Sequence, residues 1–149
     1  MSEPATVHAS AVLVGESGIL IRGASGSGKS TLVLALLAER WNPARLVADD
    51  RVALAAVHGR LLASVPPALA GLMEIRGQGI VRRPYVSPVV VRLVVDLMPP
   101  DLSPRFPEES DASTVVEGVR LRRLIIPAGA SDAALRLRVA GSIEGIKYK

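Results

Sequence analysis

Eight consecutive residues constrain this chain more than any other feature of its sequence. They are Gly23, Ala24, Ser25, Gly26, Ser27, Gly28, Lys29 and Ser30. They fit the pattern Gly-x-x-x-x-Gly-Lys-Ser/Thr, between a short apolar run at 19–21 and a helical pattern at 29–40. In such a strand–loop–helix unit, backbone N–H groups converge on phosphate oxygens at the helix N-terminus. The loop therefore predicts a bound nucleoside triphosphate, with Lys29 on the β- and γ-phosphates and Ser30 on Mg²⁺.

The composition indicates a single globular domain over residues 1–149. Hydrophobic residues make up 49% of the chain and charged residues 21%, which is typical of a domain with its own core. The absence of cysteine excludes disulfides, thiolate metal sites and a cysteine nucleophile. No signal peptide is evident, and no apolar stretch approaches the ~20 residues that cross a bilayer. We therefore expect a cytoplasmic protein without a membrane partner.

The formal net charge of +4 raises the question of a nucleic-acid partner. The arginines are spread along the predicted strands and around the phosphate loop. Aromatic residues, which would stack on bases, make up 3% of the chain. We expect no nucleic-acid partner, because the positive charge suits anionic substrates or an acidic protein partner.

The apolar pattern predicts a β-rich α/β fold. Strands are expected at 7–14, 19–21, 46–48, 52–57, 60–63, 89–97, 115–116 and 119–126. The first two, and the pair at 52–57 and 60–63, have the short polar or glycine-containing connections of hairpins. The proline-rich segment 99–113 is expected to be a loop, and residues 146–149 a frayed end.

Helical patterns are fewer than strand patterns. One helix is expected at 29–40, ending before the Asn-Pro pair at 42–43. A second is expected from about residue 132, with Ser131 as its cap and with Leu135 and Val139 on one face. Leu69, Leu72 and Met73 have the spacing of a short helical turn.

Two adjacent acids follow the apolar run at 46–48. Asp49 and Asp50 lie about twenty residues after Lys29. In phosphate-loop folds a neighbouring strand ends beside the loop, so one acid there can serve Mg²⁺ while the other takes a proton from an acceptor hydroxyl. From the residues alone, an ordinary turn at these acids stays open, as does a structural rather than a catalytic role for His8.

A third segment, residues 74–79, has the sequence Glu-Ile-Arg-Gly-Gln-Gly. Together with His8, the phosphate loop and residues 46–51, in this order and spacing, it resembles the catalytic domain of the HPr kinase/phosphorylase family. The resemblance covers roughly residues 6–128. It implies the α/β fold shared by HPr kinases and phosphoenolpyruvate carboxykinases, with a β-rich sheet and a phosphate-loop helix. It also implies ATP and Mg²⁺ as cofactors, and as substrate a serine of HPr, the phosphocarrier of the sugar phosphotransferase system.

The resemblance also implies roles for individual residues. Lys29 corresponds to the phosphate-contacting lysine, and Ser30 and Glu74 to metal ligands. Asp50 corresponds to the base that deprotonates the acceptor serine, and His8 to a histidine that supports this aspartate. Arg105, in the loop at 99–113, corresponds to the family's catalytic arginine. A basic segment linked to dephosphorylation corresponds to Arg120, Arg122 and Arg123.

Departures from the family leave alternatives open. The chain resembles the short alphaproteobacterial forms, which lack the N-terminal domain of longer members, and its C-terminal helical region is reduced. The family's hexameric assembly and its phosphorolysis of phospho-HPr are therefore expectations of the resemblance only. The alternatives are a nucleotide-gated regulatory module that binds without phosphoryl transfer, and a small-metabolite phosphate-loop kinase.

Overall fold

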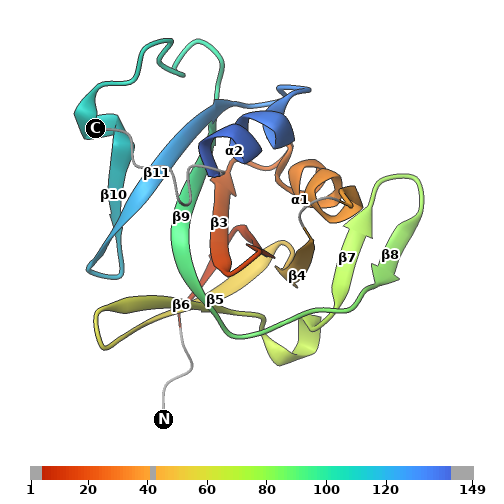
Figure 1. Ribbon diagram of the computed structural model, residues 1–149. Helices are drawn as coiled ribbons and strands as arrows, with labels where there is room; N and C mark the ends of the chain where they lie inside the picture. The colour runs from red at the N-terminus through yellow and green to blue at the C-terminus, as the bar shows by residue number, and fades with distance from the viewer. Residues whose placement is uncertain (1–4, 41–42, 142–149) are drawn as a thin grey trace.

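Figure 1 shows the computed structural model, which describes residues 5–40 and 43–141. A single curved sheet forms most of the molecule, and two helices pack together on one side of it (Figure 1). The strands are β1 (Ala5–His8), β2 (Ser10–Val14), β3 (Ser17–Gly23), β4 (Ala44–Ala48), β5 (Arg51–Val57), β6 (Arg60–Ser64), β7 (Leu72–Ile75), β8 (Gly79–Arg82), β9 (Val89–Met98), β10 (Ser113–Val116) and β11 (Val119–Pro127). The helices are α1 (Lys29–Ala38) and α2 (Ala133–Gly141), with short 3₁₀ turns η1 (Pro67–Leu69) and η2 (Glu109–Ala112).

Strand β9 is the centre of the sheet. It pairs in parallel with β3 on one side and with β11 on the other, whereas its first two residues pair antiparallel with β6. The sheet order is β1-β5-β6-β9-β3-β2-β4, with β11 and then β10 joined to β9 as well. Because one strand has these three neighbours, the sheet curls around β9 (Figure 1). The hairpin β7–β8 forms a separate two-stranded sheet beside α1 (Figure 1).

Buried apolar side chains form two clusters, which we call the helix-side cluster and the inner cluster. The helix-side cluster is made of Val12, Val14, Ile19, Ile21, Leu32, Val33, Leu36, Leu46, Met73, Leu93, Val95, Leu97, Ile126 and Leu137. The inner cluster is made of Ala9, Ala11, Leu20, Val47, Ala48, Val52, Leu54, Leu61, Ala63, Val89, Val91, Val94 and Leu121. Because β9 supplies residues to both clusters, it is apolar almost throughout, as expected for a strand covered on both faces.

The close pairing of β3 with β9 depends on Gly18. A β-carbon at this position would lie 2.4 Å from the carbonyl oxygen of Val90, which no side chain tolerates. The register shifts at this point, since Gly18 pairs with Val91 and Ile19 with Leu93. This shift leaves Val91 in the inner cluster and Leu93 in the helix-side cluster.

Most of the predicted elements are present. The hairpin β5–β6, strand β9 and the pair β10–β11 confirm the expected strands. The run predicted at 7–14 breaks at Ala9, because β1 pairs with β5 while β2 pairs with β3 and β4. Helix α1 ends at Ala38 rather than at residue 40. The next residue, Glu39, caps this end, because its backbone N–H donates to Leu36 O.

The helical turn predicted for Leu69, Leu72 and Met73 is wrong in its second half. Only Leu69 lies in a 3₁₀ turn, whereas Leu72 and Met73 belong to strand β7. The predicted loop at 99–113 contains η2, and its last residue, Ser113, begins β10.

The C-terminal helix packs through a residue that the pattern did not single out. In α2, Leu135 and Val139 are exposed, whereas Leu137 is buried in the helix-side cluster. The frayed end predicted at 146–149 lies outside the described residues. Within residues 5–40 and 43–141, no helix has the length and apolar content that crossing a bilayer requires.

Candidate active site

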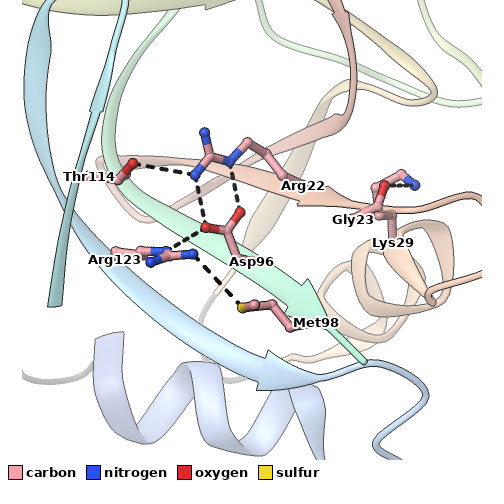
Figure 2. A network of polar contacts seen from close by, with 7 residues as sticks. All are labelled: Arg22, Gly23, Lys29, Asp96, Met98, Thr114 and Arg123. Atoms are coloured by element: carbon pink, nitrogen blue, oxygen red, sulfur yellow. Dashed lines mark hydrogen bonds and ion pairs between the residues drawn. The ribbon is translucent and has the colours of Figure 1, made fainter. Parts of the chain in front are cut away.

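The phosphate loop connects β3 to α1. Gly26 and Gly28 have φ values of 81° and 103°, a left-handed conformation that favours glycine. Gly28 caps α1, and its carbonyl accepts the first helical hydrogen bond from Leu32 N at 2.9 Å. The buried Lys29 donates from Nζ to Gly23 O at 2.8 Å (Figure 2) and to Ala24 O at 3.0 Å. An ammonium group has three donors, so Lys29 retains one N–H for a phosphate oxygen.

Asp49 is buried beneath the loop and joins three segments of the chain. Its Oδ1 accepts hydrogen bonds from Ser30 Oγ at 2.7 Å and from Ser10 Oγ at 2.9 Å. Its Oδ2 lies 3.4 Å from the backbone N of Glu74. Sequence reasoning missed Ser10, although a serine inside an apolar strand was a signal that could have found it. These contacts fix the position of the Ser30 hydroxyl.

Asp50 faces the opposite way from Asp49. Its backbone has φ 74°, a left-handed conformation that is uncommon outside glycine but is more accessible to Asp than to most residues. Its side chain is 70% exposed, and its Oδ1 lies 2.9 Å from His8 Nε2. The pairing of β1 with β5 places His8 opposite Arg51, and Ala9 N donates to Asp50 O at 3.2 Å. Two adjacent acids thus have different surroundings, one buried with the loop serine and one exposed beside a histidine.

The hairpin β7–β8 carries the third predicted segment. Met73 points into the helix-side cluster, whereas Glu74, next in the strand, is exposed. Gly77 and Gly79 have φ values of 87° and 91°, and Gln78 N donates to Ile75 O at 2.9 Å to close the turn. This strand alternation turns the side chain of Glu74 away from the core.

One cleft of about 660 Å³ collects these segments. It is lined by His8, Ser10, Ser25, Gly26, Gly28, Lys29, Ser30, Thr31, Leu34, Asp50, Met73, Glu74, Ile75, Arg76, Gly77 and Gly79. The cleft brings together six of the predicted site residues that are not loop glycines: His8, Ser25, Lys29, Ser30, Asp50 and Glu74. Three phosphate-loop residues do not line the cleft. Gly23 and Ala24 supply the two carbonyl oxygens that accept hydrogen bonds from Lys29, and Ser27, in the middle of the loop, is buried.

The predicted arginine of the loop after β9 lies elsewhere. Arg105 is exposed, its guanidinium carbon is 5.8 Å from the centroid of the Phe106 ring, and it does not belong to the lining of the cleft in the described structure. Arg120 donates to Ser113 Oγ at 3.1 Å, and Arg122 donates to Ala140 O at 3.4 Å. The role predicted for Arg105 therefore stays a prediction that the geometry does not support.

The donors around Ser30 fit Mg²⁺. The Ser30 hydroxyl lies 2.7 Å from a carboxylate oxygen of Asp49, and Ser30 and Glu74 line the same cleft, so oxygen atoms that could hold the ion lie close together. Within residues 5–40 and 43–141, no group of three or more His, Asp or Glu side chains forms a metal site by itself. Proteins commonly hold Mg²⁺ through one or two carboxylates together with water and substrate phosphates.

A comparison with known families identifies this arrangement. The model described as "HPr Serine kinase C-terminal domain" matches residues 1–127. The chain belongs to this family. The match includes the phosphate loop, both acids after β4 and the hairpin that carries Glu74.

Curated relatives named HPr kinase/phosphorylase align with part of this domain. The protein of Clostridium tetani is 46% identical over 67 residues, which are 45% of this chain and 21% of the relative. The protein of Lactobacillus delbrueckii subsp. bulgaricus is 42% identical over 82 residues, 54% of this chain and 25% of the relative. The aligned part of the chain thus spans a quarter or less of the length of these two relatives.

A solved structure confirms the fold of the HPr kinase family. The HPr(Ser) kinase/phosphatase from Coxiella burnetii matches with a TM-score of 0.79 and 25% sequence identity. The match covers 95% of this chain and 97% of that chain. The predicted α/β fold, with a β-rich sheet and a helix after the phosphate loop, is therefore confirmed.

Proposed function

We propose that this chain is an ATP-dependent protein-serine kinase that phosphorylates HPr. One observation carries the proposal: the Asp50–His8 pair lines the same cleft as the phosphate loop with Lys29 and Ser30. A base and a phosphate cradle in one cleft are what transfer to a hydroxyl requires. The names of the relatives support HPr as the acceptor. The use of ATP as a substrate agrees with the cytoplasmic location expected from the sequence.

The phosphate loop holds the triphosphate. Its backbone N–H groups and Lys29 bind phosphate oxygens, while Asp49 keeps the Ser30 hydroxyl in place beside them. When bound at Ser30 and Asp49, Mg²⁺ would neutralise charge on the β- and γ-phosphates. Binding and orientation of the nucleotide therefore depend on exposed loop N–H groups that the buried Lys29 and Asp49 support from within.

Asp50 acts as the base for the acceptor, the serine hydroxyl of HPr. It removes the proton from the serine hydroxyl as the serine oxygen bonds to the γ-phosphorus and the bond to the bridging oxygen of ADP breaks. His8, in contact with Asp50 Oδ1, orients the carboxylate. In phosphorolysis of phospho-HPr, the second reaction that the family resemblance implies, inorganic phosphate would attack the phosphoserine phosphorus. The bond to the serine oxygen would break as pyrophosphate forms, and protonated Asp50 would give its proton to the departing serine oxygen. The exposure of Asp50 suits a group that must meet a protein substrate.

The Asp50→Asn variant tests the proposal. With purified HPr, Mg²⁺ and radiolabelled ATP, we expect wild-type protein to label a serine of HPr and Asp50→Asn to lose about 10²–10⁴-fold in rate. Its affinity for ATP should change little, because Asn keeps the shape of Asp and the loop contacts belong to Asp49. Asp101→Asn, an exposed acid in the loop after β9, is the matched control and should keep the wild-type rate.

Each of the other outcomes has a meaning. Tight ATP binding by folded wild-type protein without labelling of HPr would contradict the kinase proposal and identify a nucleotide-gated binding module. Full activity in Asp50→Asn would contradict the role of Asp50 as the base. Assembly into a homo-oligomer stays a prediction of the family resemblance.

A further inference from the structure

A partly buried ion cluster lies next to the first residue of the phosphate loop. The Asp96 side chain on β9 is 10% exposed and accepts hydrogen bonds from arginines on both neighbouring strands. Arg22 on β3 donates from Nε at 2.7 Å and from Nη2 at 2.8 Å, one bond to each carboxylate oxygen. Arg123 on β11 donates from Nε at 2.5 Å. Figure 2 shows the two guanidinium groups meeting at Asp96 from opposite sides.

The cluster joins the two strands that enter the loop region. Arg22 is the residue immediately before Gly23, the first residue of the phosphate loop. Strand β11 runs on from Arg123 to Pro127 and then into a turn, in which Ala128 N donates to Met98 O at 2.6 Å. Asp96 thus connects the start of the phosphate loop to the strand that leads into this turn.

The turn after β11 touches the phosphate loop itself. Gly129 N donates to Ser27 O at 3.1 Å, and a β-carbon on Gly28 would lie 3.9 Å from the same nitrogen. Ser27 is buried, so this carbonyl depends on a partner within the protein. The hydrogen bond from Gly129 fixes the middle of the loop, between the glycines that give it its shape.

From these contacts we infer that Asp96 is a positioning residue for the nucleotide. By tying Arg22 to Arg123 it holds the Gly129 turn against Ser27, and so keeps the N–H groups of the loop aligned for phosphates. This inference rests on the proposed use of ATP. Alignment matters because donors that stabilise phosphoryl groups act at fixed positions, and an error of about 1 Å can cost 10²-fold in rate.

The chemistry of the cluster favours positioning over simple packing. Apolar residues of similar volume would hold the strands together equally well, since buried ion pairs often add little net stability over hydrophobic replacements. A carboxylate with three directional bonds from two guanidinium groups instead sets the relative placement of β3 and β11. That placement is the quantity on which the contact between Gly129 and Ser27 depends.

The first test is Asp96→Asn, with Asp132→Asn as the matched control. Asp132 also pairs with an arginine, Arg136, but on the exposed surface at the start of α2. In Asp96→Asn we expect the Kd and KM for Mg·ATP to rise about tenfold, within the range that misplacement causes. The KM for HPr should not change, and Asp132→Asn should match wild type in all three constants.

A second readout does not depend on ATP. Hydrogen–deuterium exchange of the nucleotide-free protein should be faster at Gly129 and in the phosphate loop of Asp96→Asn, and unchanged in β5 and β6. Arg123→Met, which removes the β11 side of the cluster and leaves the Arg22–Asp96 pair, should have the same effects to a smaller degree. Failure of HPr phosphorylation in wild type would leave these comparisons intact, so the two proposals fail separately.

Two results would overturn the inference. One is a folded Asp96→Asn protein, or a folded Arg123→Met protein, with lower stability to urea but wild-type affinity for ATP and wild-type exchange at Gly129. The other is failure of both variants to fold, which would assign the cluster to folding rather than to positioning.

Discussion

At the scale of single residues, Asp49 and Asp50 show how one peptide bond separates two environments. Asp49 is 6% exposed and receives the Ser10 and Ser30 hydroxyls, whereas Asp50 is turned out beside His8 by its left-handed backbone. The sequence predicted a division of labour between adjacent acids. It could not show from the residues alone which acid is buried, because the φ of Asp50 is set by the tight β4–β5 connection.

Asp96 leads to a prediction for acid stability. Burial alone would raise its pKa, but hydrogen bonds and charges from Arg22 and Arg123 outweigh burial and hold the pKa of Asp96 below its ordinary value of 3.8. Since the folded pKa is lower than the unfolded one, the ionised carboxylate stabilises the fold above pH 3.8. This contribution is lost as the pH falls below 3.8 through the folded pKa.

Urea denaturation over a pH series that passes through 3.8 measures this effect. At neutral pH, Asp96→Asn should lower the free energy of unfolding by about 3 kcal/mol, the scale on which a buried pair responds to loss of one partner. The difference from wild type should shrink as the pH falls below 3.8. Asp132→Asn should cost less than about 1 kcal/mol, because its pair is on the surface. A gap between Asp96→Asn and wild type that does not vary with pH would contradict the depressed pKa.

At the scale of elements, the hairpin β7–β8 shows why the apolar pattern of a short segment can predict the wrong secondary structure. Leu69, Leu72 and Met73 have helical spacing, yet Met73 and Ile75 pack against the helix-side cluster while Glu74 between them is exposed. Four residues are too few for a period of two to be distinguished from a period of 3.6. The family resemblance still identified Glu74, because it rests on the order of residue types and not on secondary structure.

Helix α2 provides a matched pair of leucines for an element-scale prediction. Leu137 is buried beside α1, whereas Leu135, two residues earlier, is 64% exposed. Leu137→Ala should lower the free energy of unfolding by about 2–5 kcal/mol because it leaves a cavity. Leu135→Ala should change it by no more than about 0.5 kcal/mol. Equal effects of the two substitutions in urea denaturation would show that α2 does not pack as described.

At the scale of the whole molecule, the site depends on contacts between distant parts of the chain. The sequence contains the residue types at 8, 23–30, 50 and 74–79, but only the packing of the large sheet, α1 and the hairpin β7–β8 brings these segments to one cleft. Pairing of β1 with β5 sets His8 beside Asp50, and parallel pairing of β9 with both β3 and β11 creates the Asp96 cluster. Local sequence patterns do not predict which distant strands pair with each other. For this reason the contact between Gly129 and the phosphate loop was not predicted.

The sharing of β9 between the two clusters predicts that the whole domain unfolds as one unit. Leu36 belongs to the helix-side cluster and Leu61 to the inner cluster, and both are fully buried. Leu36→Ala and Leu61→Ala should each lower the free energy of unfolding by about 2–5 kcal/mol in a single transition. If β9 separated from the sheet, both clusters would lose buried residues, so neither cluster should stay folded without the other.

Hydrogen–deuterium exchange under conditions that report global opening distinguishes one unit from two. In each variant, the slowest amides of β3 and of β6 should lose protection by the same free energy, equal to the loss measured in urea. If Leu61→Ala accelerated exchange in β6 and left β3 protected, the inner cluster would unfold by itself. The phosphate loop, which follows β3, would then be independent of β5, whose pairing with β1 holds Asp50 beside His8.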